Sequence, residues 1–531
     1  MRHNEPTSAI RIIDFLEKAE NRWPDKPAVS FQGKTLNWKE TAERCRGLAQ
    51  LLVHAGVRRG DRVAFLGFNS RSCFESYYAP ALIGAMLVPI NYRLSLREMI
   101  ECIDDAAPRV LIVDAAHRDQ GMAIRQACSC VEKIIYADEG MPPKGMLSYE
   151  QALNEAVKPN LVDLTPSEND DTVMFFYTGG TTGRSKGVML TNANLAANTI
   201  GTAPLYKLVE GETFLIAGPM FHLAAGARVF TVAEMGGHCI ILPKFDALEV
   251  LQAIEKYHIN SITMVPTMFQ LLLDHPQFSS IDLSSLRMIT YGAAPMPFAL
   301  MSRIIEAFPG TDIYQSFGMT EASPVVTVLD CKYHTLEESN LNVLSSAGKP
   351  VPYVDVKIFD EKDRELANGE IGEIVVRGPT IMKGYWQLPE LTQQALEGGW
   401  YHTGDAGYMD AQGFLYLEGR VKDMIVSGGE NVYPIEVENV LSDHSAVHQC
   451  AVIGIPHATW GEAVHGVISL KQGKSVSEQE LIEFCRERLA HYKCPVSITI
   501  KDESLPLSAV NKILKSELRK PFWKGHKSQL I

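Results

Sequence analysis

The fold of this chain is decided by a glycine-rich stretch, Thr178-Gly179-Gly180-Thr181-Thr182-Gly183-Arg184-Ser185-Lys186-Gly187, which directly follows the apolar run Val173-Met174-Phe175-Phe176-Tyr177. This order predicts a buried strand that leads into a phosphate-binding loop. Glycines let the backbone approach an oxyanion, the threonine and serine hydroxyls add donors, and Lys186 adds a positive charge. The stretch therefore predicts a site for a triphosphate.

Three other interpretations of this stretch compete with a triphosphate site. A Walker loop needs Gly-Lys followed by Ser or Thr, whereas Lys186 stands between Ser185 and Gly187. Residues 183–187 spell the G-x-S-x-G of a hydrolase elbow, but an elbow serine sits at the tip of a strand, and a flanking lysine is a poor proton acceptor at neutral pH. A glycine-rich surface loop without a ligand is the remaining alternative.

Length and charge exclude several classes of protein. A chain of 531 residues is too long for one hydrophobic core, so we expect two or more domains. The net charge of -13 argues against a nucleic-acid-binding protein, because phosphate recognition needs a clustered excess of Lys and Arg. An acidic enzyme that binds an anionic cofactor must concentrate its positive charge locally.

The sequence also bears on compartment. The first residues lack the apolar core of a signal peptide, and no uninterrupted apolar run approaches the roughly 20 residues of a membrane span. We therefore expect a cytoplasmic protein with no transmembrane segment. The 10 cysteines are scattered, with only Cys128 and Cys130 close together, which favours reduced thiols over a disulfide framework or a zinc site.

Helical and strand-like patterns alternate along the first two thirds of the chain, which predicts a parallel sheet covered by helices, an α/β fold. The pattern predicts helices over 10–20, 38–55 and 74–87. It also predicts a buried strand over 214–223 that contains His222 near its end, followed by small residues at 224–227. Such small residues would leave room for a bulky group.

Two further strands are predicted to end at the same crevice as the phosphate loop. One covers 288–291 and ends in Gly292-Ala293-Ala294-Pro295, and the other begins at Asp312 and runs into Ser316-Phe317-Gly318-Met319-Thr320-Glu321. In open α/β sheets, ligands bind at the carboxyl ends of the strands. From about 347, short alternating strands predict a small β subdomain, and after a charged, glycine-dense junction at 419–434 the pattern predicts a compact α+β module.

This ordered set of motifs resembles the adenylate-forming superfamily, in its AMP-forming acyl-CoA synthetase (fatty-acid:CoA ligase) branch. The resemblance covers nearly the whole chain and rests on eight segments, 178–187, 219–222, 292–295, 316–321, 401–405, 419–423, 427–434 and 506–512. It implies an adenylation domain over 1–419, a hinge at 420–422 and a small mobile C-terminal lid domain over 423–531. It also implies two steps, in which a carboxylate and ATP give acyl-AMP and a thiol then gives the thioester.

The resemblance assigns ATP, magnesium and coenzyme A to particular residues. Thr178, Gly179, Gly180, Thr181, Thr182, Gly183 and Lys186 would hold the β and γ phosphates, and Thr320 would reach the α phosphate. Glu321 would hold magnesium, with Thr178 as a second ligand. Magnesium is a hard cation that bridges phosphates, and a carboxylate is a ligand that it prefers.

The nucleoside would lie on the next motifs. By resemblance, adenine lies against Gly292, Ala293 and Ala294, with Phe317 as the stacking face within the segment Ser316, Phe317, Gly318, Met319 and Thr320. Phe317 stands where many relatives have tyrosine, and it keeps the stacking surface. Asp405 would accept hydrogen bonds from the ribose hydroxyls, with Arg420 beside it.

Lys512 is the residue that the resemblance assigns to the first half-reaction, where it would bridge the attacking carboxylate and the nucleotide. Relatives usually have glycine immediately before this lysine, and this chain has Asn511, which tolerates left-handed backbone geometry. Lys422 matches the hinge. A swing of the small domain would replace Lys512 with the loop Ser427-Gly428-Gly429-Glu430, whose glycines leave a tunnel for pantetheine.

The acid itself is less well defined by the sequence. Small residues at 224–227, with Ala293, Ala294, Gly318 and Val325, predict a roomy apolar pocket for a medium or long fatty acid or an aromatic one, with His222 positioning the carboxylate. Likeness to bacterial fatty-acyl-CoA synthetases favours a fatty acid. The alternatives are an aryl or other acid, transfer to a carrier protein, a luciferase-like monooxygenase and a non-catalytic nucleotide-binding module. A homodimer is compatible with the sequence, which does not fix the oligomeric state.

Overall fold

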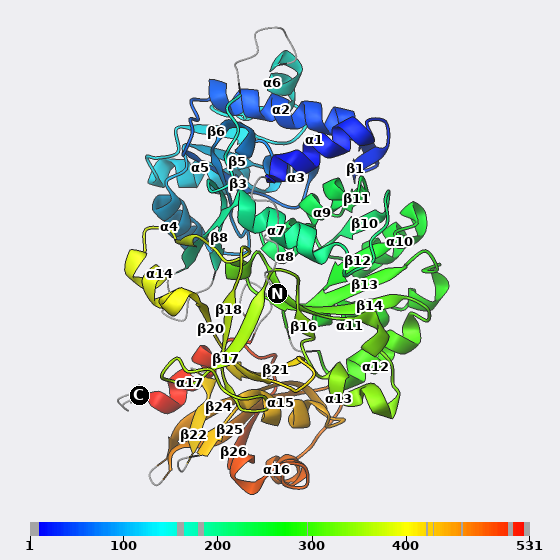
Figure 1. The fold of residues 1–531 in the computed structure, drawn as a ribbon, viewed down its shortest axis with the longest axis vertical. Coiled ribbons are helices and arrows are strands. Elements are labelled where there is room, and N and C mark those ends of the chain that lie inside the picture. Colours follow the sequence, from blue (N-terminus) through cyan, green and yellow to red (C-terminus); the bar gives the residue numbers. More distant parts are fainter. Residues whose placement is uncertain are drawn as a thin grey trace.

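The chain forms two sheets covered by helices, a smaller β subdomain and a C-terminal module (Figure 1), and the first two sheets each take strands from separate parts of the sequence. The computed structural model describes residues 10–156, 164–178, 185–294, 296–420, 423–427, 430–457, 460–507 and 513–524. The predicted α/β class, with a large N-terminal domain and a small α+β C-terminal domain, is confirmed. The sheets of the large domain are mixed, because antiparallel strands lie at their edges.

The larger sheet has the strand order β16-β15-β14-β13-β12-β10-β11-β1-β2. Its central strands β14, β13, β12, β10, β11 and β1 are parallel neighbours, and their carboxyl ends therefore meet at one edge. The strands are β1 (Pro27–Phe31), β2 (Lys34–Asn37), β10 (Thr213–Ile216), β11 (His238–Ile241), β12 (Ser261–Met264), β13 (Met288–Gly292), β14 (Asp312–Gly318), β15 (Val325–Leu329) and β16 (Lys349–Pro350).

The second sheet has the order β19-β9-β8-β4-β3-β5-β6-β7 and contains the apolar run that the sequence predicted as a buried strand. That run is β8, whose residues Val173 to Phe176 are at most 1% exposed. The strands are β3 (Arg62–Leu66), β4 (Met86–Pro89), β5 (Val110–Val113), β6 (Lys133–Tyr136), β7 (Leu147–Ser148), β8 (Thr172–Thr178), β9 (Lys186–Thr191) and β19 (Gly384–Tyr385).

Helices cover these sheets, and several begin at side-chain caps that the sequence supplies. Asn37, Ser95 and Thr191 each accept a hydrogen bond from the backbone amide three residues later, which satisfies a donor that the helix start leaves unpaired. The helices are α1 (Ile12–Arg22), α2 (Trp38–His54), α3 (Arg71–Ser76), α4 (Leu96–Ala106), α5 (Arg118–Ala127), α6 (Tyr149–Ala156), α7 (Asn192–Thr202), α8 (Leu223–Gly226), α9 (Arg228–Glu234), α10 (Ala247–Tyr257), α11 (Pro266–Leu273), α12 (Phe298–Ala307), α13 (Leu341–Leu344) and α14 (Pro389–Ala395).

Two predicted elements were wrong. The helix expected over 74–87 is instead the end of α3, a 3-10 turn at Ala81–Ile83 and strand β4, because Pro80 interrupts the helical ladder and Gly84 adopts a left-handed φ of 68°. The strand expected over 214–223 ends at Ile216. His222 then precedes α8 as its N-terminal flanking residue.

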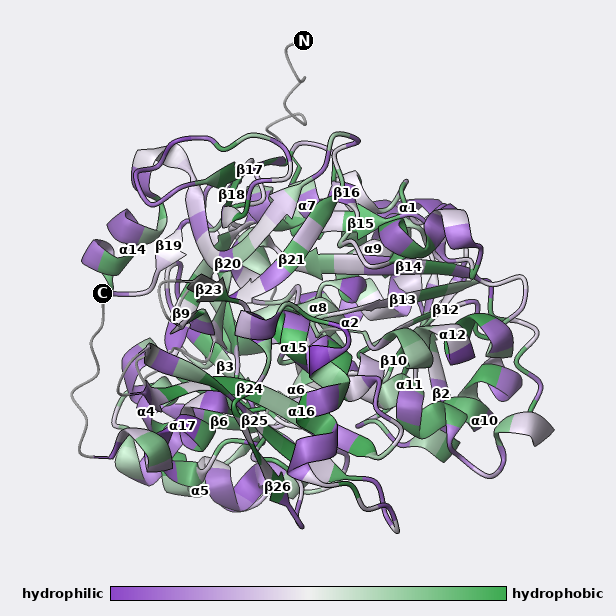
Figure 2. Ribbon diagram, turned by 90° about the horizontal axis from the view of Figure 1, so that it is seen from below, coloured by the Kyte–Doolittle hydropathy of each residue, from purple (hydrophilic) through white to green (hydrophobic). Residues whose placement is uncertain are grey.

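The β subdomain and the C-terminal module each have their own sheet. The first has the order β17-β18-β20-β21, and the second has β23-β22-β25-β24 with β26 beside β25. In Figure 2, β24 and β25 are largely green, whereas α16 alternates in colour because only one of its faces is buried. The elements are β17 (Asp355–Phe359), β18 (Gly372–Arg377), β20 (Tyr401–Met409), β21 (Leu415–Arg420), β22 (Ile425–Ser427), β23 (Glu430–Val432), α15 (Pro434–Ser442), β24 (Val447–His457), β25 (Gly461–Leu470), α16 (Glu478–Arg486), β26 (Ser497–Lys501) and α17 (Lys515–Trp523).

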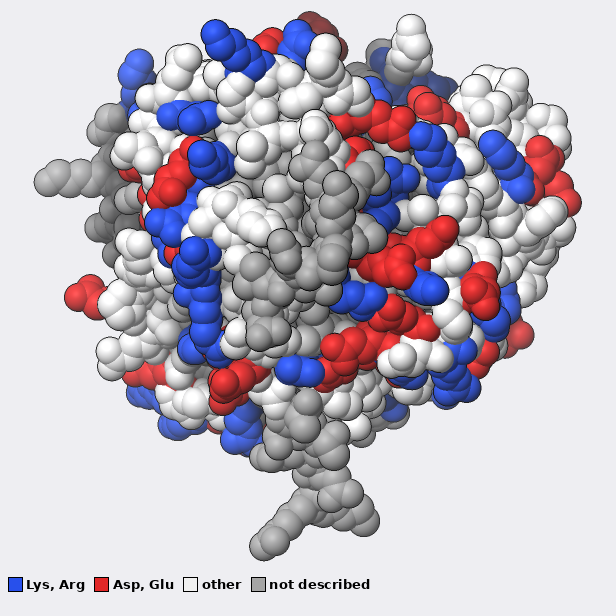
Figure 3. Space-filling view, turned by 90° about the horizontal axis from the view of Figure 1, so that it is seen from above, with Lys and Arg blue, Asp and Glu red and all other residues white. Residues whose placement is uncertain are grey.

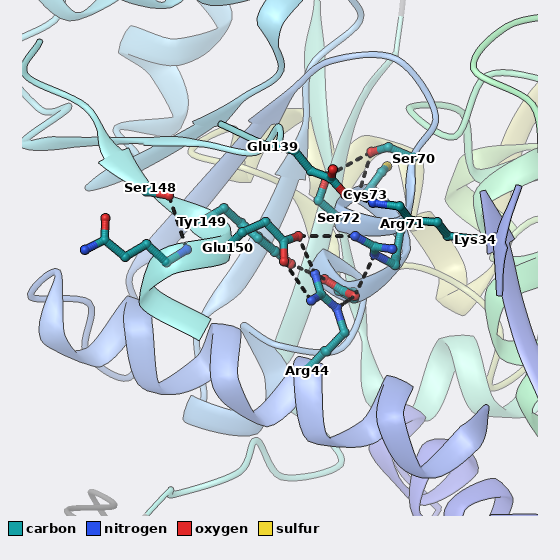
Figure 4. Close-up of polar contacts among 12 residues, drawn as sticks. Lys34, Arg44, Ser70, Arg71, Ser72, Cys73, Glu139, Ser148, Tyr149 and Glu150 are labelled. Atoms are coloured by element: carbon teal, nitrogen blue, oxygen red, sulfur yellow. Dashed lines mark hydrogen bonds and ion pairs between the residues drawn. The ribbon is translucent and has the colours of Figure 1, made fainter. Parts of the chain in front are cut away.

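A buried ion-pair network joins helices α2, α3 and α6 (Figure 4). The carboxylate of Glu75 on α3 has no exposed surface and is bonded by Arg44 of α2 at 2.5 Å. Arg44 also pairs with Glu150 of α6 at 2.7 Å, and Arg71 lies 3.3 Å from the same Glu150. The network therefore ties α2, α3 and α6 together by charge as well as by apolar packing.

Charge on the outer surface is mixed. On the face seen in Figure 3, basic and acidic side chains are interspersed among the described residues. Within the described part of the chain, no helix has the length and apolar character that crossing a bilayer requires. All ten cysteines are free thiols.

Candidate active site

The glycine-rich loop joins the two strands of an antiparallel hairpin rather than a strand and a helix. Thr178 at the end of β8 is paired with Lys186 at the start of β9, and Tyr177 is paired with Gly187. The predicted phosphate-binding residues Gly179, Gly180, Thr181, Thr182 and Gly183 lie outside the described residues. The hairpin therefore fixes the two ends of the loop, with one predicted ligand at each end.

Lys186 and Glu321 are brought together by a residue that the sequence did not single out, Tyr385 of β19. The Lys186 Nζ atom lies 5.2 Å from the centroid of the Tyr385 ring, and the Tyr385 hydroxyl donates a hydrogen bond of 3.2 Å to Glu321 Oε1. Burial raises the pKa of Glu321, while the Tyr385 hydrogen bond and the charges of Arg420 and Lys186 act in the opposite direction. A carboxylate in such a setting gains from a bound cation.

The backbone also connects these residues. Strand β19 pairs with β9 through Gly384 with Met189 and Tyr385 with Val188. The amide of Met382, two residues before β19, donates 2.8 Å to the carbonyl oxygen of Glu321. One short segment is thus bonded both to the hairpin and to the turn Thr320–Ala322 that carries Glu321.

Asp405 and Arg420 form an ion pair beside this cluster. They face each other in the β20–β21 register, and the Arg420 Nε atom lies 2.6 Å from Asp405 Oδ1. The Asp405 side chain is only 13% exposed, whereas that of Arg420 is 46% exposed. Arg420 also donates 3.1 Å to the carbonyl of Thr403. The pair presents a fixed carboxylate beside a half-exposed guanidinium.

Backbone packing at the carboxyl ends of β13 and β14 leaves no room for a side chain at the glycines there. Gly292 is paired with Ser316, and a Cβ atom on Gly292 would lie 2.1 Å from the Ser316 carbonyl oxygen. Ala293 follows with a φ of 63°, in the left-handed region. Gly318 is equally constrained, since a Cβ there would lie 1.9 Å from the Pro324 carbonyl oxygen. The glycines of both motifs are thus required by backbone packing, whatever the ligand.

The backbone of the segment that contains His222 is hydrogen-bonded to the side chains of Asn69 and Tyr77. Asn69 accepts a hydrogen bond of 2.8 Å from the Met220 amide, and the Tyr77 hydroxyl donates to the Met220 carbonyl. A Cβ on Gly226 would lie 1.8 Å from the Tyr77 hydroxyl oxygen. The small residue at position 226 is therefore required by the packing of Tyr77.

Two family models match this chain and cover most of it. The model of the AMP-binding enzyme matches residues 16–386, and that of the AMP-binding enzyme C-terminal domain matches residues 436–512. The chain belongs to the AMP-binding enzyme family. It is an AMP-forming acid–thiol ligase, an ATP-dependent acid:CoA ligase that works through an acyl-adenylate.

The relatives of this ligase act on different acids. A feruloyl-CoA synthase from Amycolatopsis sp is 39% identical over 94% of this chain and 96% of its own length. A long-chain-fatty-acid–CoA ligase from Bacillus subtilis (strain 168) is 34% identical over 99% of this chain and 97% of its own. The structure of o-succinylbenzoate CoA synthetase from Bacillus subtilis, in complex with its acyl-adenylate intermediate, matches with a TM-score of 0.82 at 30% identity, covering 95% of this chain and 97% of that chain.

Several predicted site residues of the ligase cannot be placed, because Lys422, Gly428, Gly429 and Lys512 lie outside the described residues. Ser427 and Glu430 are paired at the end of the β22–β23 hairpin. The remaining predicted residues fall on the strands and turns described above: Ala294 follows Ala293, Phe317 lies in β14, and Met319 and Thr320 follow that strand.

At the junction between β21 and the C-terminal module, Glu418 faces two charged residues. Burial and the nearby carboxylate of Glu436 raise the pKa of Glu418 to about 7, while Lys493 acts in the opposite direction. Lys493 is itself ion-paired with Glu436. The junction therefore contains a carboxylate whose charge changes near neutral pH.

Proposed function

We propose that the ligase forms its acyl-adenylate at the cluster of Lys186, Glu321, Asp405 and Arg420. The observation that supports this proposal is the Tyr385 side chain, which contacts Lys186 and donates a hydrogen bond to Glu321. The first half-reaction moves a carboxylate toward a polyanion, so neutralising charge on the phosphates lowers its barrier. Lys186 and the donors of the loop would do this at the β and γ phosphates, and Thr320 at the α phosphate.

The chemistry of the donors fits magnesium. Among the described residues, no group of three or more His, Cys, Asp and Glu could hold a metal by itself. Mg²⁺ in nucleotide sites uses one or two protein carboxylates together with phosphate oxygens and water, and the buried Glu321 supplies one such carboxylate. Glu321 and Thr178 would hold the ion, which would neutralise phosphate charge when bound.

The nucleoside is proposed to lie across the ends of β13 and β14. Gly292, Ala293 and Ala294 would border adenine, and Phe317 would stack on it. The Asp405 carboxylate, oriented by Arg420 at 2.6 Å, would accept hydrogen bonds from the ribose hydroxyls. The Ser427–Glu430 loop and coenzyme A belong to the second half-reaction, which Lys422 would allow as the hinge.

For the acid, we propose an aryl acid, with a fatty acid as the second candidate. The sequence favoured a medium or long fatty acid, and the fatty-acid ligase at 34% identity supports that prediction. The relative at 39% identity, which is named for an aryl acid, supports the aryl candidate. His222 is proposed to position the carboxylate of either acid.

The test is acid-dependent exchange of pyrophosphate into ATP, measured over a panel of aryl acids and alkanoic acids of increasing length. We expect exchange with at least one acid, and its loss in Lys512→Ala. Thioester formation is then compared with coenzyme A and with a carrier protein as acceptor. Exchange that Lys512→Ala leaves unchanged would overturn the proposed role of Lys512, and no exchange with any acid would overturn the proposed function.

A further inference from the structure

Arg228, the first residue of α9, follows His222 by six positions and lies beside the parallel strands of the larger sheet. Its Nη2 atom donates a hydrogen bond of 3.1 Å to the Thr290 hydroxyl, in the middle of β13. Its guanidinium carbon lies 5.2 Å from the centroid of the Tyr206 ring. The side chain is partly buried, and no carboxylate of the described residues is ion-paired with it.

This setting differs from that of two other partly buried arginines in the same domain, which are paired with carboxylates. Arg44 is bonded to Glu75 and Glu150, and Arg287 lies 2.5 Å from the buried carboxylate of Glu212. Withdrawing a guanidinium from water without an anionic partner costs free energy, and arginine does not lose its proton to avoid that cost. Arg228 is therefore suited to an acceptor that arrives with a ligand.

Two threonines near Arg228 form a hydrogen-bonded pair on neighbouring strands, before the carboxyl ends of those strands. The hydroxyls of Thr263 on β12 and Thr290 on β13 are hydrogen-bonded at 2.5 Å, and these two residues are paired in the sheet. Thr290 has no exposed surface. It precedes Gly292 by two residues, so it faces the same side of the sheet, about 7 Å deeper along the strand.

Tyr206 contacts both Arg228 and the strand ends at which the nucleotide motifs lie. Its hydroxyl is hydrogen-bonded at 2.6 Å to Ser316 Oγ, and Ser316 is paired with Gly292 at the end of β13. Its ring lies against the Arg228 guanidinium. The side chain thus spans from the strand ends, where adenine is proposed to lie, down to Arg228.

We propose that Arg228 is a specificity-determining residue that donates hydrogen bonds to an oxygen substituent on the far end of the acid, away from the reacting carboxylate. The inference rests on the proposed function and narrows its substrate class to aryl acids whose ring carries a hydroxyl, methoxy or carboxyl oxygen. A plain alkyl end would offer the guanidinium no acceptor besides the Thr290 hydroxyl. A site built to hydrogen-bond a substituent rejects the analogue that lacks it.

The experiment compares kcat/KM for a pair of aryl acids that differ only in the ring oxygen, such as 4-hydroxycinnamate and cinnamate. In the natural chain we expect the ring-substituted aryl acid to be preferred over its parent by at least about tenfold. Arg228→Met should reduce kcat/KM for the substituted acid by about 100-fold and leave that for the parent acid within about threefold. Arg303→Met, which removes a half-exposed arginine of α12 that is ion-paired with Asp274, is the matched control for loss of one charge and should change neither value.

Two further variants keep the inference testable if Arg228→Met does not fold. Arg228→Lys should retain part of the preference, and Thr290→Val, which removes the hydroxyl that receives the Arg228 hydrogen bond, should weaken it. The inference is overturned if these variants lower kcat/KM equally for both members of a pair, or if the preference persists without Arg228. A natural chain that activates no acid at all would instead overturn the proposed function.

Discussion

The close approach of two strand ends at the proposed nucleotide site gives a quantitative prediction for Gly292→Ala. The new Cβ would lie 2.1 Å from the Ser316 carbonyl oxygen, whereas ordinary contact begins at 3.4 Å. Strands β13 and β14 would therefore have to separate by about 1.3 Å at their carboxyl ends. Since a misplacement of about 1 Å can cost roughly 100-fold in rate, we expect kcat/KM for ATP to fall by about that factor. Overpacking should cost only about 1–3 kcal/mol of stability, so the variant should remain folded.

The assay is acid-dependent pyrophosphate exchange at varied ATP, with circular dichroism to check the fold. The control is Gly218→Ala, because a Cβ there would lie 3.4 Å from the Ala225 Cβ, which is an ordinary contact. We expect the control to retain activity within about threefold. A folded Gly292→Ala enzyme with the natural kcat/KM for ATP would show that the spacing of these strand ends does not position the nucleotide.

Three more predictions follow from other contacts. Tyr385→Phe removes the donor to the buried Glu321 carboxylate, and since a hydrogen bond to a charged group contributes about 1.5–3 kcal/mol, exchange should slow by roughly 10–100-fold, with a changed dependence on magnesium; an unaltered rate would contradict this. Glu75→Gln breaks the network with Arg44 and should lower the free energy of unfolding in urea by about 3–5 kcal/mol without changing the KM for ATP; a loss below 1 kcal/mol would argue that the network contributes little. Glu418 binds its proton more tightly in the folded chain, so the stability of the natural chain should fall as pH rises from about 5 to 7. Glu418→Gln should remove this fall and should melt at a higher temperature than the natural chain at pH 8 but not at pH 5. Melting temperatures of the two proteins that change in parallel with pH would refute the raised pKa of Glu418.

The sequence predicted most of the strands, because buried parallel strands are short, nearly continuous apolar runs bounded by glycine, proline or charge. The run before the glycine-rich loop is one example. The expectation failed over 74–87, where apolar residues are dense enough for either a helix or a strand and Pro80 and Gly84 decide between them. Spacing alone does not distinguish the two structures in such a segment.

The residues of the proposed site could be predicted from the sequence only where they lie in contiguous motifs. Lys186, Glu321 and Asp405 each stand in such a motif. Tyr385 was missed because its role comes from contacts with residues far away in the chain, and a short Gly-Tyr-Trp sequence carries no recognisable pattern. Arg228 was missed for the same reason, since its partner Thr290 lies 62 residues further on.

The segment that contains Met382 and Tyr385 also has a mechanical consequence. Hydrogen bonds attach it to hairpin strand β9 on one side and to the turn of Glu321 on the other. The same segment therefore fixes the positions of both the Lys186 cation and the Glu321 carboxylate. A triphosphate bound at the proposed site would meet charges whose spacing the fold has already set, so little reorganisation would accompany its binding.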